Sequence, residues 1–433
     1  MINKIKNSAF IKSTIILLLG GTLTKILGFI LKIIITRKIG TEGIALYSLL
    51  SPTMSLLTVL AIFSYPTAIS KIISEKNSSP KKLLISIIPI SIIINIALIV
   101  LVILFAPILS NNLLKEPRLY YPIIYVAFTL PFVSISSIIK GYFWGKQNMF
   151  PYMLSNFLEQ VTRFILISFF IADIASKSLT KAICFILFIN IIGEIISQLV
   201  MIKYFPKTKI NKNDIKINKN EIKNIMQITI PSTSSKIIGS ISYFLEPIIL
   251  TNMLLYFGYS KEYILYEYGV LNAYALSLLL MPQFFTQNMS SALVPELSKY
   301  YSQGNKEMCK KRIKQIVLVS FLIGLLSTVI IVSYPNFFLN ALFSTTEGID
   351  YIKIIAPFTI LFYIEYPLIN ALQALGEAKK AMYAGIIGSI IRLLSIIVFS
   401  ALKIGMYTLV LSIITTLIYS TISYYKIIKK VLN

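Results

Sequence analysis

The chain has 433 residues, of which 56% are hydrophobic and only 13% are charged, and its formal net charge is +24. Soluble domains carry about 25% charged residues, so this composition excludes an ordinary soluble protein and predicts an integral membrane protein. The chain has no histidine and only two cysteines, in dissimilar surroundings, so we expect no imidazole catalysis, no disulfide and no metal site.

Twelve apolar stretches are long enough to cross about 30 Å of hydrocarbon as helices. They cover approximately residues 13–36, 44–70, 83–109, 119–140, 150–172, 180–202, 223–251, 265–298, 315–334, 352–375, 381–402 and 405–425. The first stretch is too long for the apolar part of a signal peptide, so we expect it to be retained as a transmembrane helix. We therefore predict an all-α integral membrane protein.

The basic residues outside these stretches alternate between two sides of the predicted membrane. One side, which includes both termini, carries 27 lysines and arginines, and the other side carries nine. The positive-inside rule then predicts that both termini lie in the cytoplasm. This distribution accounts for the positive charge without a nucleic-acid partner.

An internal repeat divides the chain into two halves. "TLTKILG" (22–28) resembles "TSSKIIG" (233–239), and "SKIISEKN" (70–77) resembles "SKYYSQGN" (298–305). We predict an N-terminal six-helix lobe at 1–205, a basic cytoplasmic linker at 206–222 and a C-terminal six-helix lobe at 223–433. Because six is even, both lobes enter the membrane from the same side, so a pseudo-twofold axis along the membrane normal relates them. Two such lobes that rock about a central cavity are typical of a transporter, so we expect no enzymatic activity.

Five basic residues lie inside the predicted spans, where a charge costs roughly 2.5–3.5 kcal/mol on insertion scales. They are Lys25, Lys32, Arg163, Lys236 and Arg392. The repeat pairs Lys25 with Lys236 and Arg163 with Arg392, and we expect Lys25 and Lys236 to face each other across a cavity. Lys32 lies near the outer end of its helix, where its side chain is equally suited to reaching the interface. Arg163 follows Glu159 by one helical turn, so an intrahelical ion pair is an alternative to a functional role.

Acidic residues also lie inside the spans, and they have two interpretations. Each one pairs with a buried cation, or it binds a coupling ion such as H⁺ or Na⁺. The candidates are Glu365, Glu194, Glu159 and Glu246. Transport driven by the membrane potential is a third possibility, and no other cofactor is expected.

A basic cavity indicates an anionic substrate, because lysine and arginine supply charged hydrogen-bond donors to phosphate. A lipid-linked sugar carries a diphosphate and a polar headgroup that does not cross a bilayer unaided. The predicted substrate-binding residues are Lys25, Lys236, Arg392, Lys32 and Arg163.

Several longer stretches resemble a known family. They are "GFILKIIITRKIGTEGIALYSLLSPTMSLLTVLAIFSYPTAISKIISEKN" (28–77), "IPSTSSKIIGSISYFLEPIIL" (230–250), "MPQFFTQNMSSALVPELSKYYSQGN" (281–305) and "ALQALGEAKKAMYAGIIGSIIRLL" (371–394). The chain is similar to the polysaccharide-biosynthesis flippases related to stage V sporulation protein B and MurJ, in the multidrug, oligosaccharidyl-lipid and polysaccharide exporter superfamily. The resemblance implies alternating access and polyprenyl-diphosphate sugars as substrates, for peptidoglycan, spore cortex or another polysaccharide. The chain departs from relatives with fourteen helices, whose last pair forms a groove for the lipid tail.

Two alternatives to a flippase stay open. A multidrug or cation antiporter on the same fold requires a deep carboxylate rather than the lysines. A non-transporting membrane scaffold for wall synthesis requires neither the deep carboxylate nor the buried lysines. In each case we expect the protein to be a monomer in the lipid bilayer.

Overall fold

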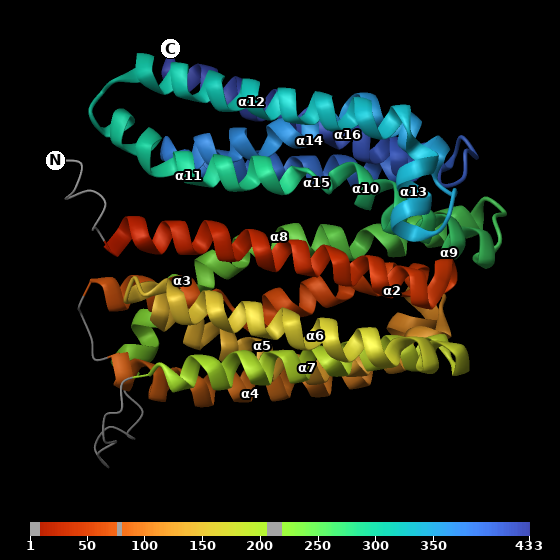
Figure 1. Cartoon of the computed structure of the whole chain (residues 1–433), viewed down its shortest axis with the longest axis horizontal. Helices are drawn as coiled ribbons and strands as arrows, with labels where there is room; N and C mark the ends of the chain where they lie inside the picture. Colours follow the sequence, from red (N-terminus) through yellow and green to blue (C-terminus); the bar gives the residue numbers. More distant parts are fainter. Residues whose placement is uncertain (1–8, 76–79, 206–218) are drawn as a thin grey trace. The chain divides into compact units, whose positions relative to one another are not determined.

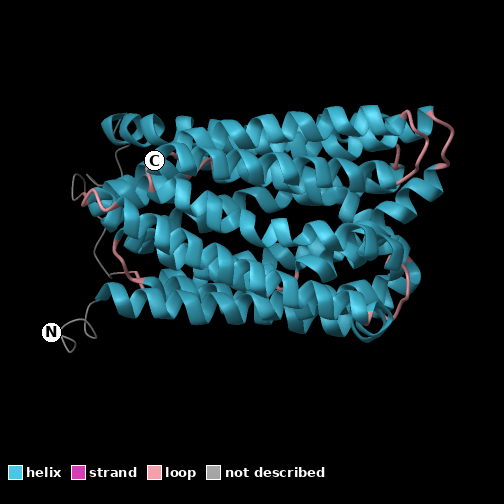
Figure 2. Cartoon of the chain, turned by 90° about the horizontal axis from the view of Figure 1, so that it is seen from above, coloured by secondary structure: helices cyan, strands magenta, loops and turns pink. Residues whose placement is uncertain are grey.

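The computed structural model describes residues 9–75, 80–205 and 219–433, and within these ranges the fold is all-α, with no strand (Figures 1 and 2). The helices in the first half are α2 (Ala9–Ile62), α3 (Tyr65–Ser74), α4 (Pro80–Pro107), α5 (Tyr120–Gly145), α6 (Met149–Lys177) and α7 (Leu179–Lys203). Short π and 3₁₀ turns, η1 (Ile108–Leu113) and η2 (Pro117–Leu119), connect α4 to α5. The all-α prediction is confirmed.

The second half begins with a long helix that starts at the end of the predicted linker. Its helices are α8 (Lys219–Tyr256), α9 (Lys261–Gly269), α10 (Leu276–Leu280), α11 (Gln283–Ser302), α12 (Lys306–Ser333), α13 (Pro335–Phe343), α14 (Ile349–Ala374), α15 (Ala378–Ser400) and α16 (Tyr407–Leu432). A π turn, η4 (Val270–Ala275), joins α9 to α10. Residues 206–218 of the predicted linker lie outside the described residues.

Ten helical stretches in the described ranges are long and apolar enough to cross a membrane. The 55-residue stretch Gly20–Ser74 contains most of the first predicted span and all of the second, and α6 covers the fifth without being among the ten. Apolar side chains on the outer faces support this interpretation. On α4, Ile93 and Leu104 are 66% and 68% exposed, and Leu326 on α12 is 64% exposed. Such side chains are stable in contact with lipid.

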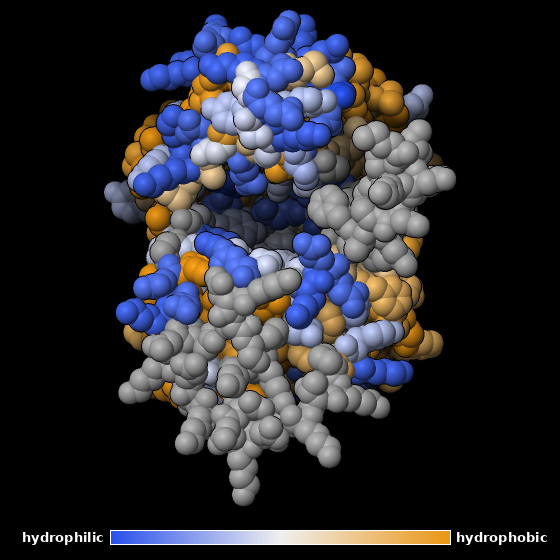
Figure 3. All heavy atoms as spheres, turned by 90° about the vertical axis from the view of Figure 1, so that its left-hand side faces the viewer, coloured by the Kyte–Doolittle hydropathy of each residue, from blue (hydrophilic) through white to orange (hydrophobic). Residues whose placement is uncertain are grey.

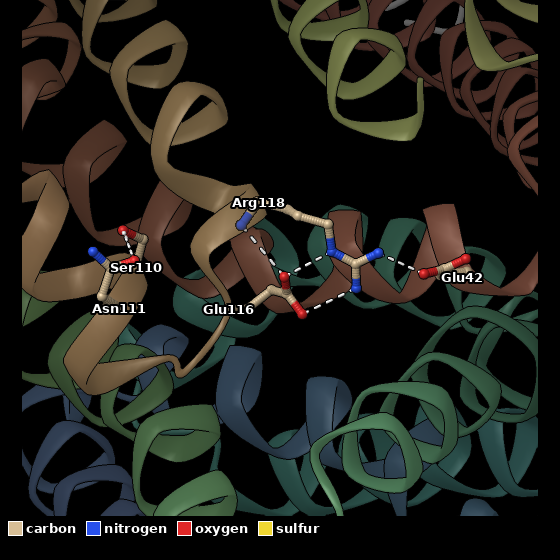
Figure 4. Close-up of polar contacts among 5 residues, drawn as sticks. All are labelled: Glu42, Ser110, Asn111, Glu116 and Arg118. Carbon is tan, nitrogen blue, oxygen red and sulfur yellow. Dashed lines mark hydrogen bonds and ion pairs between the residues drawn. The ribbon is translucent and has the colours of Figure 1, made fainter. Parts of the chain in front are cut away.

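Residue Gly40 separates the first two spans. Its φ of 68° and ψ of −177° interrupt α2, and this backbone conformation favours glycine because it has no Cβ. Just beyond the break, Arg118 of η2 donates to Glu42 over 2.5 Å and to Glu116 over 2.8 and 3.1 Å (Figure 4). The contact joins the start of the second span to the α4–α5 connection. The sequence analysis included Arg118 only in its count of basic residues outside the predicted spans.

The chain divides into two compact units, which consist of residues 1–43 with 50–241 and residues 44–49 with 242–433. The boundary inside α8 therefore assigns residues 223–241 to unit 1, although the sequence analysis gave them to the second lobe. The physical reason is the core of unit 1, where Ile225 at the start of α8 is buried with residues of α3, α4 and α5. Unit 2 has its own core, which α11, α12, α14, α15 and α16 build.

Close helix packing inside unit 1 depends on a glycine of α5. A Cβ on Gly141 would lie 2.8 Å from the Cα atom of Pro66 and 3.0 Å from its carbonyl oxygen, both in the backbone of α3. Larger residues would push α3 and α5 apart. The packing of these helices positions α6 and α7, which carry the buried charges of this unit.

Candidate functional site

The two lysines that the repeat pairs lie near the middle of long helices. Lys25 stands about midway between Ala9, where α2 begins, and the break at Gly40, and Lys236 stands near the centre of the 38-residue α8. Both side chains are exposed on the surface of the protein. Because helices of these lengths exceed the hydrocarbon thickness, both charges lie well inside the predicted membrane.

The helix faces around these lysines are open at two glycines. A Cβ on Gly21 or on Gly239 would have no atom of another residue within 4 Å. On α2, this face is covered by α6 near Gly28, where a Cβ would be 3.9 Å from Oε1 of Gln160. Lys32, one turn further, is half-buried. The face of α2 that carries Gly21, Lys25 and Gly28 is thus open at Gly21 and packs against α6 near Gly28. That Lys25 faces Lys236 stays a prediction.

Arg163 lies between two carboxylates in the interior of unit 1. Its Nη2 atom is 2.7 Å from Oε1 of Glu159 on α6 and 3.8 Å from Oε1 of Glu194 on α7. The two glutamate side chains are each 8% exposed and the arginine side chain is 19% exposed. The ion pair within α6, one of the two predicted interpretations of Arg163, is therefore present. With all three groups ionised, the cluster carries a formal charge of −1.

A glycine on α7 makes room for this cluster. A Cβ on Gly193 would lie 2.9 Å from Nε of Arg163 and 3.2 Å from Cγ of Glu159. Any larger side chain would therefore displace the guanidinium. The sequence analysis did not single out Gly193, although its place beside Glu194 in a span was a usable signal.

Unit 2 contains a related pair of charges. Arg392 on α15 forms an ion pair through Nε with Oε2 of Glu246 on α8, whose side chain is only 2% exposed. The second acid, Glu365 on α14, accepts a hydrogen bond of 3.0 Å from the hydroxyl of Ser420 on α16. The sequence offered no acid for Arg392 within its own helix, and the partner comes from a helix that is distant in the sequence.

These contacts distinguish the two predicted arginines from Lys25 and Lys236, and the half-buried Lys32 belongs to neither group. Arg163 and Arg392 each have a buried carboxylate against the guanidinium, which compensates their charge. Neither Lys25 nor Lys236 is buried, so both remain accessible from the protein surface. The lysines are therefore better suited than the arginines to contact an anion that enters from outside the helices.

Comparison with known proteins identifies the family. The family model described as "Polysaccharide biosynthesis protein" matches residues 10–301, and the model described as "MatE" matches residues 272–398. This chain belongs to the polysaccharide biosynthesis protein family. It is 32% identical to stage V sporulation protein B of Bacillus subtilis (strain 168), over 98% of this chain and 84% of that protein.

More distant relatives and solved structures agree with this family. The chain is 22% identical to the lipid II flippase MurJ of Bacillus subtilis (strain 168), over 89% of this chain and 76% of the relative. Its fold resembles an inward-facing multidrug resistance MATE family transporter of the MOP superfamily, with a TM-score of 0.76, 14% identity and coverage of 94% of both chains. This protein is therefore a multi-pass membrane transporter. The predicted resemblance to the polysaccharide-biosynthesis flippases is confirmed.

Proposed function

We propose that this protein is a flippase that moves polyprenyl-diphosphate-linked sugars across the bacterial plasma membrane by alternating access. The observation that carries the proposal is the position of two exposed lysines: Lys25 lies near the middle of the part of α2 before Gly40, and Lys236 lies near the middle of α8. A charge at this depth is stable in a water-filled cavity or against an anion, and unstable against lipid chains. A diphosphate is an anion that these two lysines are suited to bind.

The two lysines have the primary binding role in this proposal. Lysine forms charge-assisted hydrogen bonds to phosphate, and each such bond contributes about 1.5–3 kcal/mol. Lys32, Arg392 and Arg163 are further candidates for anion binding, with a smaller role for the two arginines because each is already paired with a buried carboxylate. The relatives named for sporulation and for lipid II support a cell-wall or spore-cortex precursor as the sugar lipid. We propose that the protein acts as a monomer with both termini in the cytoplasm.

The clusters of buried acids suit a coupling ion. In unit 1, Glu159 and Glu194 share one arginine, so the uptake of one proton or one Na⁺ would neutralise the cluster. In unit 2, Glu365 accepts from Ser420, and Glu246 is already paired with Arg392. We propose the pair Glu159 and Glu194 as the first candidate for coupling, followed by Glu365 and then Glu246.

A cation antiporter is the second candidate function, and the same net negative cluster in unit 1 favours it. This alternative requires the carboxylates for transport and makes the lysines dispensable. The two functions therefore predict opposite effects of removing the lysines.

The test is transbilayer movement of a labelled undecaprenyl-diphosphate sugar in proteoliposomes. Removing both charges by Lys25→Gln/Lys236→Gln should lower the rate at least about 100-fold, because two charge-assisted bonds are lost. The control Lys38→Gln/Lys261→Gln removes two exposed lysines at helix ends and should retain the wild-type rate. Equal rates in all three proteins would remove the lysines from the mechanism. Movement of a cationic dye instead of the sugar lipid, unaffected by either double variant, would favour the antiporter.

A further inference from the structure

Unit 2 contains a cavity of about 550 Å³ between α12, α14 and α16. This volume is within the range of about 300–1,000 Å³ that is typical of small-molecule sites. Each of the three helices contributes one face to it. The chemistry of these faces changes along the length of the cavity.

Three lysines lie at one end of the cavity. Lys310 and Lys314 occupy successive turns of α12, and Lys429 stands opposite them near the end of α16. All three side chains are exposed. The residues that line the cavity include no aspartate or glutamate. The three lysine side chains contribute +3 to the cavity mouth, and the terminal carboxylate of Asn433, whose Oδ1 accepts from Lys310 over 3.0 Å, offsets one of these charges.

The rest of the cavity is mainly apolar. Further along α12, Val317 follows Lys310 and Lys314 on the same face, at i+7 and i+3. Ile364 and Leu368, one turn apart on α14, line the cavity between the other two helices. On α16, Tyr425 lies one turn before Lys429. The cavity is therefore cationic at one end and apolar along its length.

The cationic end lies where lipid headgroups are expected. Hydrophilic side chains gather on the end of the molecule where the α11–α12 connection and the C-terminus lie (Figures 1 and 3). The positive-inside rule predicts that this lysine-rich end faces the cytoplasm. Basic pockets between helices on this side are suited to anionic lipid headgroups.

We propose that this cavity binds an anionic phospholipid of the inner leaflet. The phosphate lies among Lys310, Lys314 and Lys429, and an acyl chain follows the apolar faces of α12 and α14. Charge complementarity selects an anionic over a zwitterionic headgroup, and the apolar length selects a lipid over a free phosphate. This site is independent of the proposed transport of sugar lipids, so one proposal can fail without the other.

The test is native mass spectrometry of the full chain in detergent, titrated with phosphatidylglycerol or phosphatidylcholine. Wild type should retain one phosphatidylglycerol in preference to phosphatidylcholine. The variant Lys310→Gln/Lys314→Gln/Lys429→Gln should bind phosphatidylglycerol on the order of 100-fold more weakly, since each lysine near an anionic headgroup contributes roughly fivefold. The matched control Lys311→Gln/Lys426→Gln/Lys430→Gln removes three exposed lysines from the same two helices and should bind within threefold of wild type.

A second variant tests the apolar part of the site. Val317→Phe fills the cavity and leaves all three lysines in place, and it should also weaken retention of phosphatidylglycerol. If Val317→Phe does not fold, the two lysine triple variants still test the proposal, because the side chains that they change are exposed. Equal weakening in both lysine variants, or equal binding of the two lipids, would overturn the proposal. Competition by glycerol 3-phosphate at the same concentration as the lipid would assign the site to free phosphate instead.

Discussion

Replacing Arg163 with methionine should destabilise unit 1 by about 3–5 kcal/mol, because it leaves two buried carboxylates without their cation. Glu159 lies 2.7 Å from the guanidinium and Glu194 lies 3.8 Å from it, and each glutamate side chain is only 8% exposed. An interaction between unit charges at about 4 Å amounts to about 4 kcal/mol at an effective dielectric constant of 20, which is consistent with this range. This loss is a large fraction of the total stability of about 5–15 kcal/mol that is typical of a native protein.

A matched control lies on the same helix. Asp173 and Lys177 form an ion pair of 2.8 Å with the same spacing of four residues, but their side chains are 72% and 68% exposed. Lys177→Gln should therefore cost less than about 0.5 kcal/mol, because water screens an exposed pair. The two variants compare the same type of interaction on one helix at two levels of burial.

The single tryptophan provides the assay. Trp144 lies on α5 in unit 1, and its ring centroid is 5.6 Å from that of Tyr152 on α6. Its fluorescence should report the unfolding of unit 1 in detergent as denaturant is added. The triple variant Arg163→Met/Glu159→Gln/Glu194→Gln removes all three charges and should recover most of the lost stability. A loss below about 1 kcal/mol for Arg163→Met, or no recovery in the triple variant, would refute the reasoning.

Three further variants test packing, backbone geometry and the second buried pair. Gly141→Ala should cost about 1–3 kcal/mol, since its Cβ would lie 2.8 Å from the backbone of Pro66, and Trp144 fluorescence during denaturant unfolding measures this cost. Gly40→Ala should cost about 1–2 kcal/mol, because φ is 68° there, and the thermal midpoint should fall. Arg392→Met should destabilise unit 2 by about 3–5 kcal/mol through the uncompensated charge of Glu246, as measured by protection of unit 2 peptides in hydrogen exchange.

Each of these three variants has a control. Gly21→Ala places a Cβ where no atom of another residue lies within 4 Å, so it should stabilise α2 slightly or leave it unchanged. Gly40→Asn should cost about as much as Gly40→Ala, because asparagine tolerates the left-handed helical region but not φ of 68° with ψ of −177°, and no loss in either variant would argue against backbone strain. Arg392→Met/Glu246→Gln should restore protection in unit 2. Continued loss of protection in that double variant would point to packing rather than charge.

Local spacing in the sequence predicted part of the candidate site. Glu159 and Arg163 lie four residues apart in an apolar helix, so their side chains meet wherever that helix forms. Arg392 has no acid at such a spacing, and its partner Glu246 lies on α8. The participation of Glu194 and the space at Gly193 likewise depend on how α7 packs against α6. Contacts between helices have no period in the sequence, so spacing does not reveal them.

The amino-acid sequence by itself determined that this protein is a membrane-spanning bundle of helices, and it determined which charges lie deep in those helices. Both follow from local properties, namely the length of apolar segments and the rise of 1.5 Å per helical residue. Only the tertiary structure decided that Arg392 meets Glu246 and that Glu194 joins the pair of Glu159 and Arg163. It also decided that Lys310, Lys314 and Lys429 surround one cavity. The reason is that helix packing joins residues that are far apart in the chain, and small features such as the missing side chain of Gly193 decide which of them meet.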